Sequence, residues 1–209
     1  MEAAFDPELE AARAVVRPEA IRRLLDGLSA RSARVKFGSA KALVLVSEKS
    51  PRLLYPHFDE VARLLEGSNQ ILCWNAIRIL AQLASVDKAG KLERILDAYY
   101  EPISGPSLVT AANLIVSAPA IVRAKPWLAD RIAGRICSVG RARYKTPECR
   151  NVALTHAIQS LDRIFPCLSD GQAALKFVRR HTRNSRSSTR KAAEMFLRRH
   201  APAQRLRTR

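Results

Sequence analysis

The chain has 209 residues and is 47% hydrophobic, which is enough apolar material for one sizeable core or a short repeat array and argues against disorder throughout. It carries 36 Lys and Arg against 19 Asp and Glu, a net charge of +17 that indicates an anionic partner. Residues 170–209 hold 12 basic and two acidic residues, so the charge concentrates toward the C-terminus.

The first residues, MEAAFDPELEAARAVV, are acidic and contain neither a basic signal region nor a long apolar run. We therefore expect a cytoplasmic protein without a membrane span. The four cysteines, at positions 73, 137, 149 and 167, match no spacing of zinc ligands or of a redox pair. We expect buried, reduced thiols.

Apolar residues recur with helical spacing along the whole chain, and no segment alternates as a strand does, which predicts an all-α fold. Asp6 followed by Pro7, and Thr146 followed by Pro147, are typical of helix starts. The expected elements are a leading helix at 7–16 and five helix pairs: 18–29 with 31–49, 55–66 with 69–86, 88–100 with 106–119, 126–139 with 147–165, and 170–182 with 187–200.

The second helix of each pair contains a small residue followed four positions later by an apolar one, a spacing that puts both on one helix face. The pairs are Ser39 with Leu43, Ala76 with Leu80, Ala112 with Val116, Ala153 with Ala157, and Ala193 with Leu197. Successive small residues lie 37, 36, 41 and 40 positions apart. This period predicts a repeat array rather than a simple bundle.

The stretches VKFGSAKAL at 35–43, NAIRILAQLA at 75–84 and TRKAAEMFL at 189–197 resemble the second-helix pattern of HEAT repeats. The resemblance implies a right-handed α-α superhelix of about five helix pairs over residues 18–200, with approximate repeats 18–49, 55–86, 88–119, 126–165 and 170–200. Residues 1–17 would form a leading helix or cap, and 201–209 a basic tail. Armadillo-like three-helix repeats are the alternative.

In HEAT-like arrays the second helices line the concave side, so the resemblance implies that Asn75, Arg78 and Gln82 face a groove. Their spacing keeps them on one line of the helix. The positions equivalent to Arg78 are Lys41, Leu114, Thr155 and Met195. Arg78 is interpreted either as a brace that pairs with an acid in the neighbouring repeat or as a groove cation.

Lys36, Arg150 and Arg190 occupy the family's recurrent arginine position near the start of second helices. The resemblance makes them either bridges between repeats or ligand-binding cations. A further group is a candidate for contact with a polyanion: Arg179, Arg180, Arg183, Arg186, Lys191, Arg198 and Arg199, followed by Arg205, Arg207 and Arg209 in the tail. A solvated face is the alternative. Phe177 and Phe196 are expected in the core, so base stacking is not predicted.

No catalytic residues, metal ligands or cofactor motifs are predicted. His156 lies on an apolar helix face, which is typical of a core histidine. We expect a non-catalytic scaffold that binds a protein partner through its groove, and the alternative is a nucleic-acid-binding protein that uses its basic C-terminal repeat. A third hypothesis is an alkylpurine DNA glycosylase, an enzyme class built on HEAT-like repeats, for which Trp74, Trp127 and Asp130 are the available residues. The sequence predicts no oligomeric state.

Overall fold

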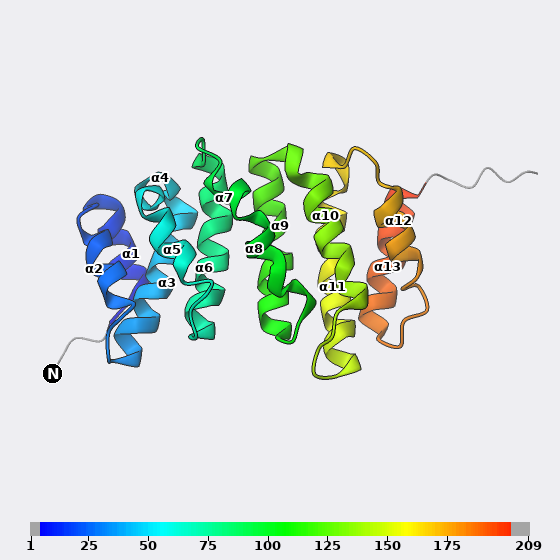
Figure 1. Ribbon diagram of the computed structural model, residues 1–209, viewed down its shortest axis with the longest axis horizontal. Coiled ribbons are helices and arrows are strands. Elements are labelled where there is room, and N and C mark those ends of the chain that lie inside the picture. The colour runs from blue at the N-terminus through cyan, green and yellow to red at the C-terminus, as the bar shows by residue number, and fades with distance from the viewer. Residues whose placement is uncertain (1–4, 202–209) are drawn as a thin grey trace, which may run out of the picture. The chain divides into compact units, whose positions relative to one another are not determined.

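The computed structural model describes residues 5–201, and every regular element in this range is a helix (Figure 1). The predicted all-α class is therefore confirmed. The chain divides into two compact units. Unit 1 comprises Met1–Glu101 with Arg123–Lys125, and unit 2 comprises Pro102–Val122 with Pro126–Arg209. The basic tail at 202–209 lies outside the described residues.

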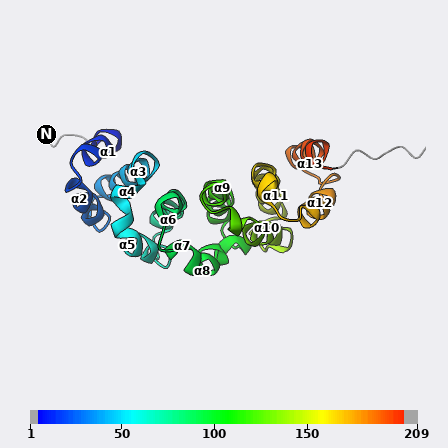
Figure 2. The ribbon, with the colours of Figure 1, turned by 90° about the horizontal axis from the view of Figure 1, so that it is seen from above.

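Unit 1 consists of two layers of helices (Figure 2). Its helices are α1 (Pro7–Val16), α2 (Ala20–Gly27), α3 (Ala33–Lys49), α4 (Pro51–Leu54), α5 (Phe58–Arg63), α6 (Gln70–Leu83), α7 (Lys91–Arg94) and α8 (Leu96–Tyr100). In one layer α3 packs between α1 and α6, and α2 and α5 pack against α3 and α6 from the other layer. Each predicted second helix is thus covered by neighbours on several sides, which explains its nearly all-round apolar composition.

Local sequence signals set the starts of several helices. Asp6 accepts hydrogen bonds from the amides of Glu8 and Leu9, at 2.9 and 3.2 Å, and thereby caps α1. Asn69 caps α6 in the same way. The helices predicted as the first of each pair are shorter than expected. The segment 55–66 begins with a 3-10 turn that contains Pro56, and the helix in the segment 88–100 breaks at Ile95.

A buried carboxylate organises the loop that precedes α7. Asp87 accepts hydrogen bonds from the Tyr55 hydroxyl at 2.6 Å and from the amides of Lys91 and Leu92 at 2.8 and 3.0 Å. The ammonium of Lys125 lies 3.3 Å from the same carboxylate, and both side chains are nearly inaccessible to solvent. This buried pair holds the segment Arg123–Lys125 in unit 1.

Unit 2 also has two layers (Figure 2). Its helices are α9 (Leu108–Ala124), α10 (Ala129–Cys137), α11 (Pro147–Ile164), α12 (Gln172–Arg179) and α13 (Ser187–His200). The first of these runs past the end of the unit at Val122. One layer contains α9, α11 and α13, and α13 packs on α11. The other layer contains α10 and α12, which pack against each other. Across the layers, α10 packs against α11 and α12 packs against α13.

Helix α9 continues to Ala124, whereas the sequence prediction ended it at residue 119. Pro119 lies inside this helix and cannot donate a hydrogen bond to the carbonyl of Ile115, four residues earlier. The hydroxyl of Ser160 on α11 donates to that carbonyl instead, at 2.8 Å. A side chain from the neighbouring helix therefore satisfies the acceptor that Pro119 leaves free.

The repeat register predicted for α9 is wrong by one residue. Val116, the expected apolar partner of Ala112, is 54% exposed, whereas Ala111 and Ile115 are fully buried. With Ala111 as the small residue, the position equivalent to Arg78 becomes Asn113, a partly exposed polar residue, and not the buried Leu114. The small residues Ser39, Ala76, Ala153 and Ala193 are all buried, as the pattern requires.

Within residues 5–201 no helix combines the length and the apolar character needed to cross a membrane. The four cysteines are free. Their burial varies more than predicted, because Cys73 is buried but Cys167 is exposed.

Candidate functional site

The excess positive charge belongs mainly to unit 2. This unit has 19 Lys and Arg against five Asp and Glu, while unit 1 has 17 against 14. Four of the five acidic side chains are already engaged within the unit: Asp130 with Ser169, Glu148 with Arg186, Asp162 with Arg199 and His200, and Asp170 with the amide of Gln172. Few carboxylates of unit 2 therefore remain to neutralise its other cations.

An open depression of about 340 Å³ lies between α10 and α12. Lys176, Arg180 and His181 form its wall on the α12 side, and Arg141 lies on the opposite wall, in the 3-10 turn Ser138–Arg141 that follows α10. Among the described residues no acidic side chain lines it. The depression is therefore a concave site with three permanent cations.

A second, smaller depression is formed by the loop between α10 and α11. Arg143 and Lys145 of this loop line it together with Arg150 in the first turn of α11, again without a described acidic residue. Arg141 of the first depression and Ala142 of the second are consecutive residues, so the two depressions adjoin. Both are concave sites formed by cations.

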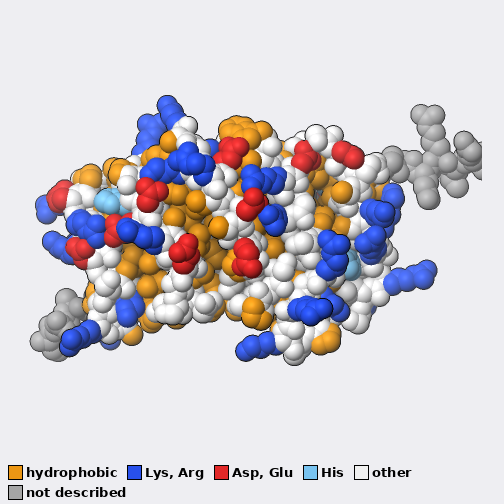
Figure 3. Space-filling view, viewed as in Figure 1, with side chains coloured by type: hydrophobic (Ala, Val, Ile, Leu, Met, Phe, Trp, Pro, Cys, Tyr) orange, Lys and Arg blue, Asp and Glu red, His pale blue; other side chains and the backbone are white. Residues whose placement is uncertain are grey.

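We call the surface formed by Arg141, Arg143, Lys145, Arg150, Lys176 and Arg180 the basic surface. All six side chains are exposed, and none has an ion pair within residues 5–201. Arg179 and Arg183 extend it along the exposed side of α12 and the turn that follows. Figure 3 shows Lys and Arg side chains gathered in the part of the view where Figure 1 places α12, with few acidic side chains among them.

Three contacts hold the loop between α10 and α11 against the segment that precedes α9. The Tyr144 hydroxyl donates to the carbonyl of Ile103 at 2.6 Å, and the amide of Arg143 donates to the carbonyl of Ser104 at 3.0 Å. Gly105 has a φ of 113°, and a Cβ there would overlap the carbonyl oxygen of Arg143. The cations of this loop therefore sit on a fixed backbone.

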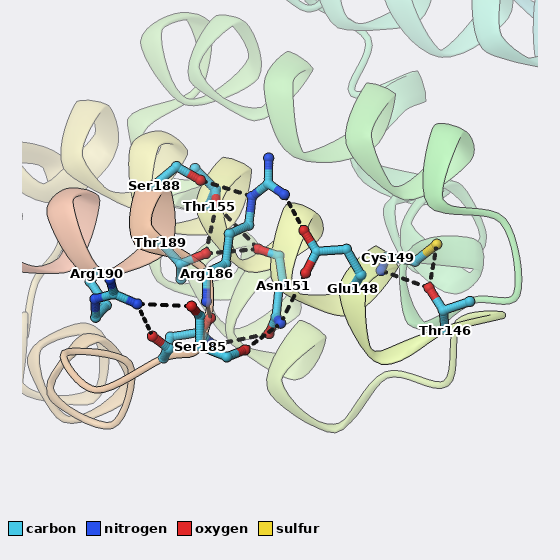
Figure 4. Close-up of polar contacts among 11 residues, drawn as sticks. Thr146, Glu148, Cys149, Asn151, Thr155, Ser185, Arg186, Ser188, Thr189 and Arg190 are labelled. Carbon is cyan, nitrogen blue, oxygen red and sulfur yellow. Dashed lines mark hydrogen bonds and ion pairs between the residues drawn. The ribbon is translucent and has the colours of Figure 1, made fainter.

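The turn between α12 and α13 is fastened to α11 by a polar network (Figure 4). Asn151 donates to the Ser185 hydroxyl at 3.0 Å, and Thr189 donates to the Asn151 carbonyl at 3.0 Å. The guanidinium of Arg190 donates to the carbonyls of Asn184 and Ser185, each at 2.8 Å. The network fixes the end of α12 relative to the first turns of α11, and thus Arg180 relative to Arg150.

The cations predicted to line a groove mostly have partners inside the protein. Arg78 pairs with Glu48 of α3 at 3.2 Å, the kind of contact that the brace interpretation requires, and Lys41 pairs with Glu8 at 2.7 Å. Arg190 is bound to backbone carbonyls, as described above. Lys36 and Gln82 are half-buried, and Asn75 donates to the carbonyl of Ile71 in its own helix.

The predicted polyanion contacts separate into two groups. Arg179, Arg180 and Arg183 belong to the basic surface or extend it, whereas Arg186 and Arg199 pair with Glu148 and Asp162. Lys191 and Arg198 are exposed on α13, in the other layer. Arg150, which the sequence predicts to face the groove, belongs to the basic surface.

Sequence reasoning missed Arg141, Arg143, Lys145 and Lys176. The signal was present in the stretch RARYKTPECR at 141–150, which has four cations and one acid. The stretch looked like an ordinary long loop between helices, and nothing in its spacing indicates that it packs beside α12. Only the fold brings these cations together with Lys176.

Asp130, Trp127 and His156, which were considered for catalysis, have different surroundings in the structure. Asp130 is held by the amide and hydroxyl of Ser169, at 3.1 and 2.5 Å, and Trp127 is 65% exposed. Burial, together with the charge of Arg186, lowers the pKa of His156. Within residues 5–201 no group of three His, Cys, Asp or Glu is placed to hold a metal ion. The glycosylase hypothesis stays a prediction.

Comparison with known proteins assigns the chain to no family: no family model matches the sequence, and no curated protein shows significant similarity to it. The basic surface is the feature of the structure that bears on function. That surface combines fixed, unneutralised cations with two adjoining depressions, an arrangement suited to binding anions.

Proposed function

We propose that the protein is a non-catalytic nucleic-acid-binding module of HEAT-like repeats, which holds the phosphate backbone on the basic surface of unit 2. The observation that carries this proposal is the set of six exposed cations around two adjoining depressions without an acidic residue. Elsewhere in unit 2, Arg186 and Arg199 already have carboxylate partners. The basic surface therefore brings together cations that are left to attract an anion.

Four of the six cations are arginines, whose planar guanidinium groups bind phosphate oxygens with two parallel hydrogen bonds. A phosphate backbone presents charges in a row and requires no fixed sequence, which suits a surface of distributed cations. A single small anion would use only part of it. The extension through Arg179 and Arg183 along α12 also favours an elongated polyanion.

Recognition of bases is not supported at this surface. Phe177 is only 7% exposed, and the Tyr144 hydroxyl is bound to Ile103. None of the aromatic side chains that line the two depressions is fully exposed, whereas proteins that bind single strands use exposed aromatic platforms. We therefore propose that the protein binds duplex nucleic acid with little preference for its sequence.

The repeat architecture supports the proposal by providing a rigid support. The two-layer packing and the buried small residues of α3, α6, α11 and α13 agree with a HEAT-like array. Five of the six cations of the basic surface lie on α12, on the residue after it, or on the segment between α10 and α11, and Arg150 lies in the first turn of α11. Cations held by packed helices lose little conformational freedom on binding, which favours affinity.

A protein-binding scaffold is the second candidate function, and one observation favours it. Val109 and Val116 on α9 and Met195 on α13 are 46%, 54% and 50% exposed, in the layer that the sequence predicts to line a groove. Exposed apolar side chains in that layer suit a protein partner. This function uses different residues from the basic surface, so the substitutions Val116→Ser and Met195→Ser should leave nucleic-acid binding unchanged.

The proposal is tested by the binding of a short fluorescent DNA duplex at low salt, measured by fluorescence anisotropy. We expect the double variant Arg141→Glu/Arg180→Glu to lose at least about 100-fold in affinity, because two attractive contacts become repulsive. The matched control is Arg31→Glu/Arg34→Glu, which changes the net charge equally at exposed positions of unit 1. Equal losses in both variants, or no binding by the wild-type protein, would overturn the proposal.

A further inference from the structure

We propose that His181 is a proton-dependent phosphate ligand in the depression between α10 and α12, and that nucleic-acid binding by this protein therefore strengthens as the pH falls. The proposal rests on the proposed function, because it concerns the regulation of the same surface. It adds to the basic surface a phosphate ligand that is not one of the six Lys and Arg side chains. It also makes affinity depend on a group that titrates near neutral pH.

The position of the imidazole supports this role. His181 lines the depression, and its ring contacts the edge of Phe177, with the ring centres 4.9 Å apart. A Cβ at Gly140, on the opposite wall, would lie 4.0 Å from the Nε2 atom of His181. Gly140 thus leaves space beside this nitrogen. Within residues 5–201 the ring makes no hydrogen bond, so Nε2 is free to contact a ligand.

The groups that face His181 come from three helices and their ends. Lys176 and Arg180 come from α12 and the residue after it, Arg141 and Cys137 from α10 and its 3-10 turn, and Arg150 from α11. No carboxylate is among them. Burial raises the pKa of Cys137 to about 11, so this thiol stays neutral in the range where the histidine titrates.

These surroundings disfavour the charged imidazole in the free protein. Burial, together with the positive charges of Arg180 and Arg150, lowers the pKa of His181 below its usual value. A phosphate group in the depression reverses this balance, because its negative charge favours the imidazolium and accepts a hydrogen bond from it. The pKa of His181 is therefore higher in the complex than in the free protein.

The sign of the pH dependence follows from linkage. Because the complex binds a proton at a higher pH than the free protein does, binding takes up protons between the two pKa values. Affinity must rise as the pH falls through this range and level off below the lower pKa. Phosphodiesters and the arginine and lysine side chains do not titrate there. A single histidine limits the change to one proton per complex.

The test measures duplex binding at fixed salt between about pH 5.5 and pH 8. We expect the wild-type protein to bind about fivefold or more tightly at the acidic end, since one charged hydrogen bond to phosphate is gained. The variant His181→Gln should lose this rise in affinity toward acidic pH and show a flat profile. His57→Gln, in unit 1, is the matched control and should retain the wild-type profile.

A second measurement does not depend on a variant. The NMR titration of the His181 imidazole in the wild-type protein should show a higher pKa with the duplex than without it. An unchanged pKa, or a wild-type profile in His181→Gln, would overturn the role of His181 while leaving the proposed function intact. Failure of the wild-type protein to bind at any pH in this range would instead refute the proposed function itself.

Discussion

The hydroxyl of Tyr144 donates a hydrogen bond to the backbone carbonyl of Ile103, 41 residues earlier, across 2.6 Å. This contact joins the loop that carries Arg143 and Lys145 to the segment before α9. Burial raises the pKa of Tyr144 to about 12, so the hydroxyl keeps its proton at any physiological pH. The contact therefore fixes two cations of the basic surface without contributing charge.

Removing this hydroxyl should weaken binding without removing a cation. In Tyr144→Phe the Ile103 carbonyl loses its partner, which should cost about 1 kcal/mol of stability. We expect a lower affinity for a DNA duplex and faster hydrogen exchange at the amides of residues 141–146. Tyr55→Phe, which removes a hydroxyl in unit 1, should reduce stability but leave affinity unchanged. Equal affinities of Tyr144→Phe and the wild type would show that loop order does not matter.

Gly134 offers a test that avoids damage to the fold. It lies in α10 at the wall of the depression, and a Cβ there would meet no atom within 4 Å. Glycine inside a helix is unfavourable by about 1 kcal/mol relative to alanine, so Gly134→Glu and Gly134→Gln should fold at least as well as the wild type. We expect the Glu variant to bind duplex at least about tenfold more weakly, because it introduces a negative charge among the cations.

The Gln variant is the control for size. It should bind within about twofold of the wild type, since it leaves the local charge unchanged. If Gly134→Glu and Gly134→Gln have the same affinity in anisotropy titrations, the depression does not receive the ligand.

The buried pair of Asp87 and Lys125 should dominate the acid sensitivity of unit 1. Burial alone would raise the pKa of Asp87, but the hydrogen bonds from Tyr55, Leu92 and Lys91 and the charge of Lys125 outweigh it, so the pKa is lowered. A carboxylate with a lowered pKa stabilises the fold above the pKa of the unfolded chain, near 3.9, and this stabilisation is lost as the pH falls toward the lower folded value.

We expect Asp87→Asn to reduce the free energy of unfolding at pH 7 by about 3 kcal/mol or more, because it removes the negative charge that opposes the buried ammonium of Lys125. Thermal unfolding followed by circular dichroism would measure this loss. Asp59→Asn is the control, since Asp59 pairs with Lys91 at 2.6 Å but is 74% exposed. Its effect should stay below about 1 kcal/mol. Similar losses in the two variants would contradict a dominant role for the buried pair.

The sequence predicted the helices best where local signals and apolar periodicity agreed. α1 begins and ends as predicted, because Asp6 and Pro7 define its start within a few residues of chain. The end of α9 was missed for a reason that is not local. A proline normally disfavours continuation of a helix. Pro119 is accommodated in α9 because the hydroxyl of Ser160 donates a hydrogen bond to the carbonyl that the proline leaves free. The repeat register predicted at Ala112 was wrong by one residue, because two adjacent alanines make two helix faces equally plausible from the sequence.

The candidate site was less predictable than the fold. The charge run at 179–183 was visible in the sequence, but its neighbours Arg141 and Arg143 are about 40 residues away and join it only through packing of α10 beside α12. The pairing of Arg186 with Glu148 and of Arg199 with Asp162 also depends on tertiary contacts. The number of cations can be read from the sequence, but the fold determines which of them keep no carboxylate partner.

The salt dependence of duplex binding tests the central claim most directly. Each phosphate contacted contributes about −0.9 to the slope of log affinity against log salt, so six cations predict a slope of about −5. Replacing Arg180 and Arg150 with Gln should reduce its magnitude by about 2, and the same change at Arg31 and Arg34 should not. A slope near zero, or one unaffected by Arg180→Gln/Arg150→Gln, would contradict binding of nucleic acid by the basic surface.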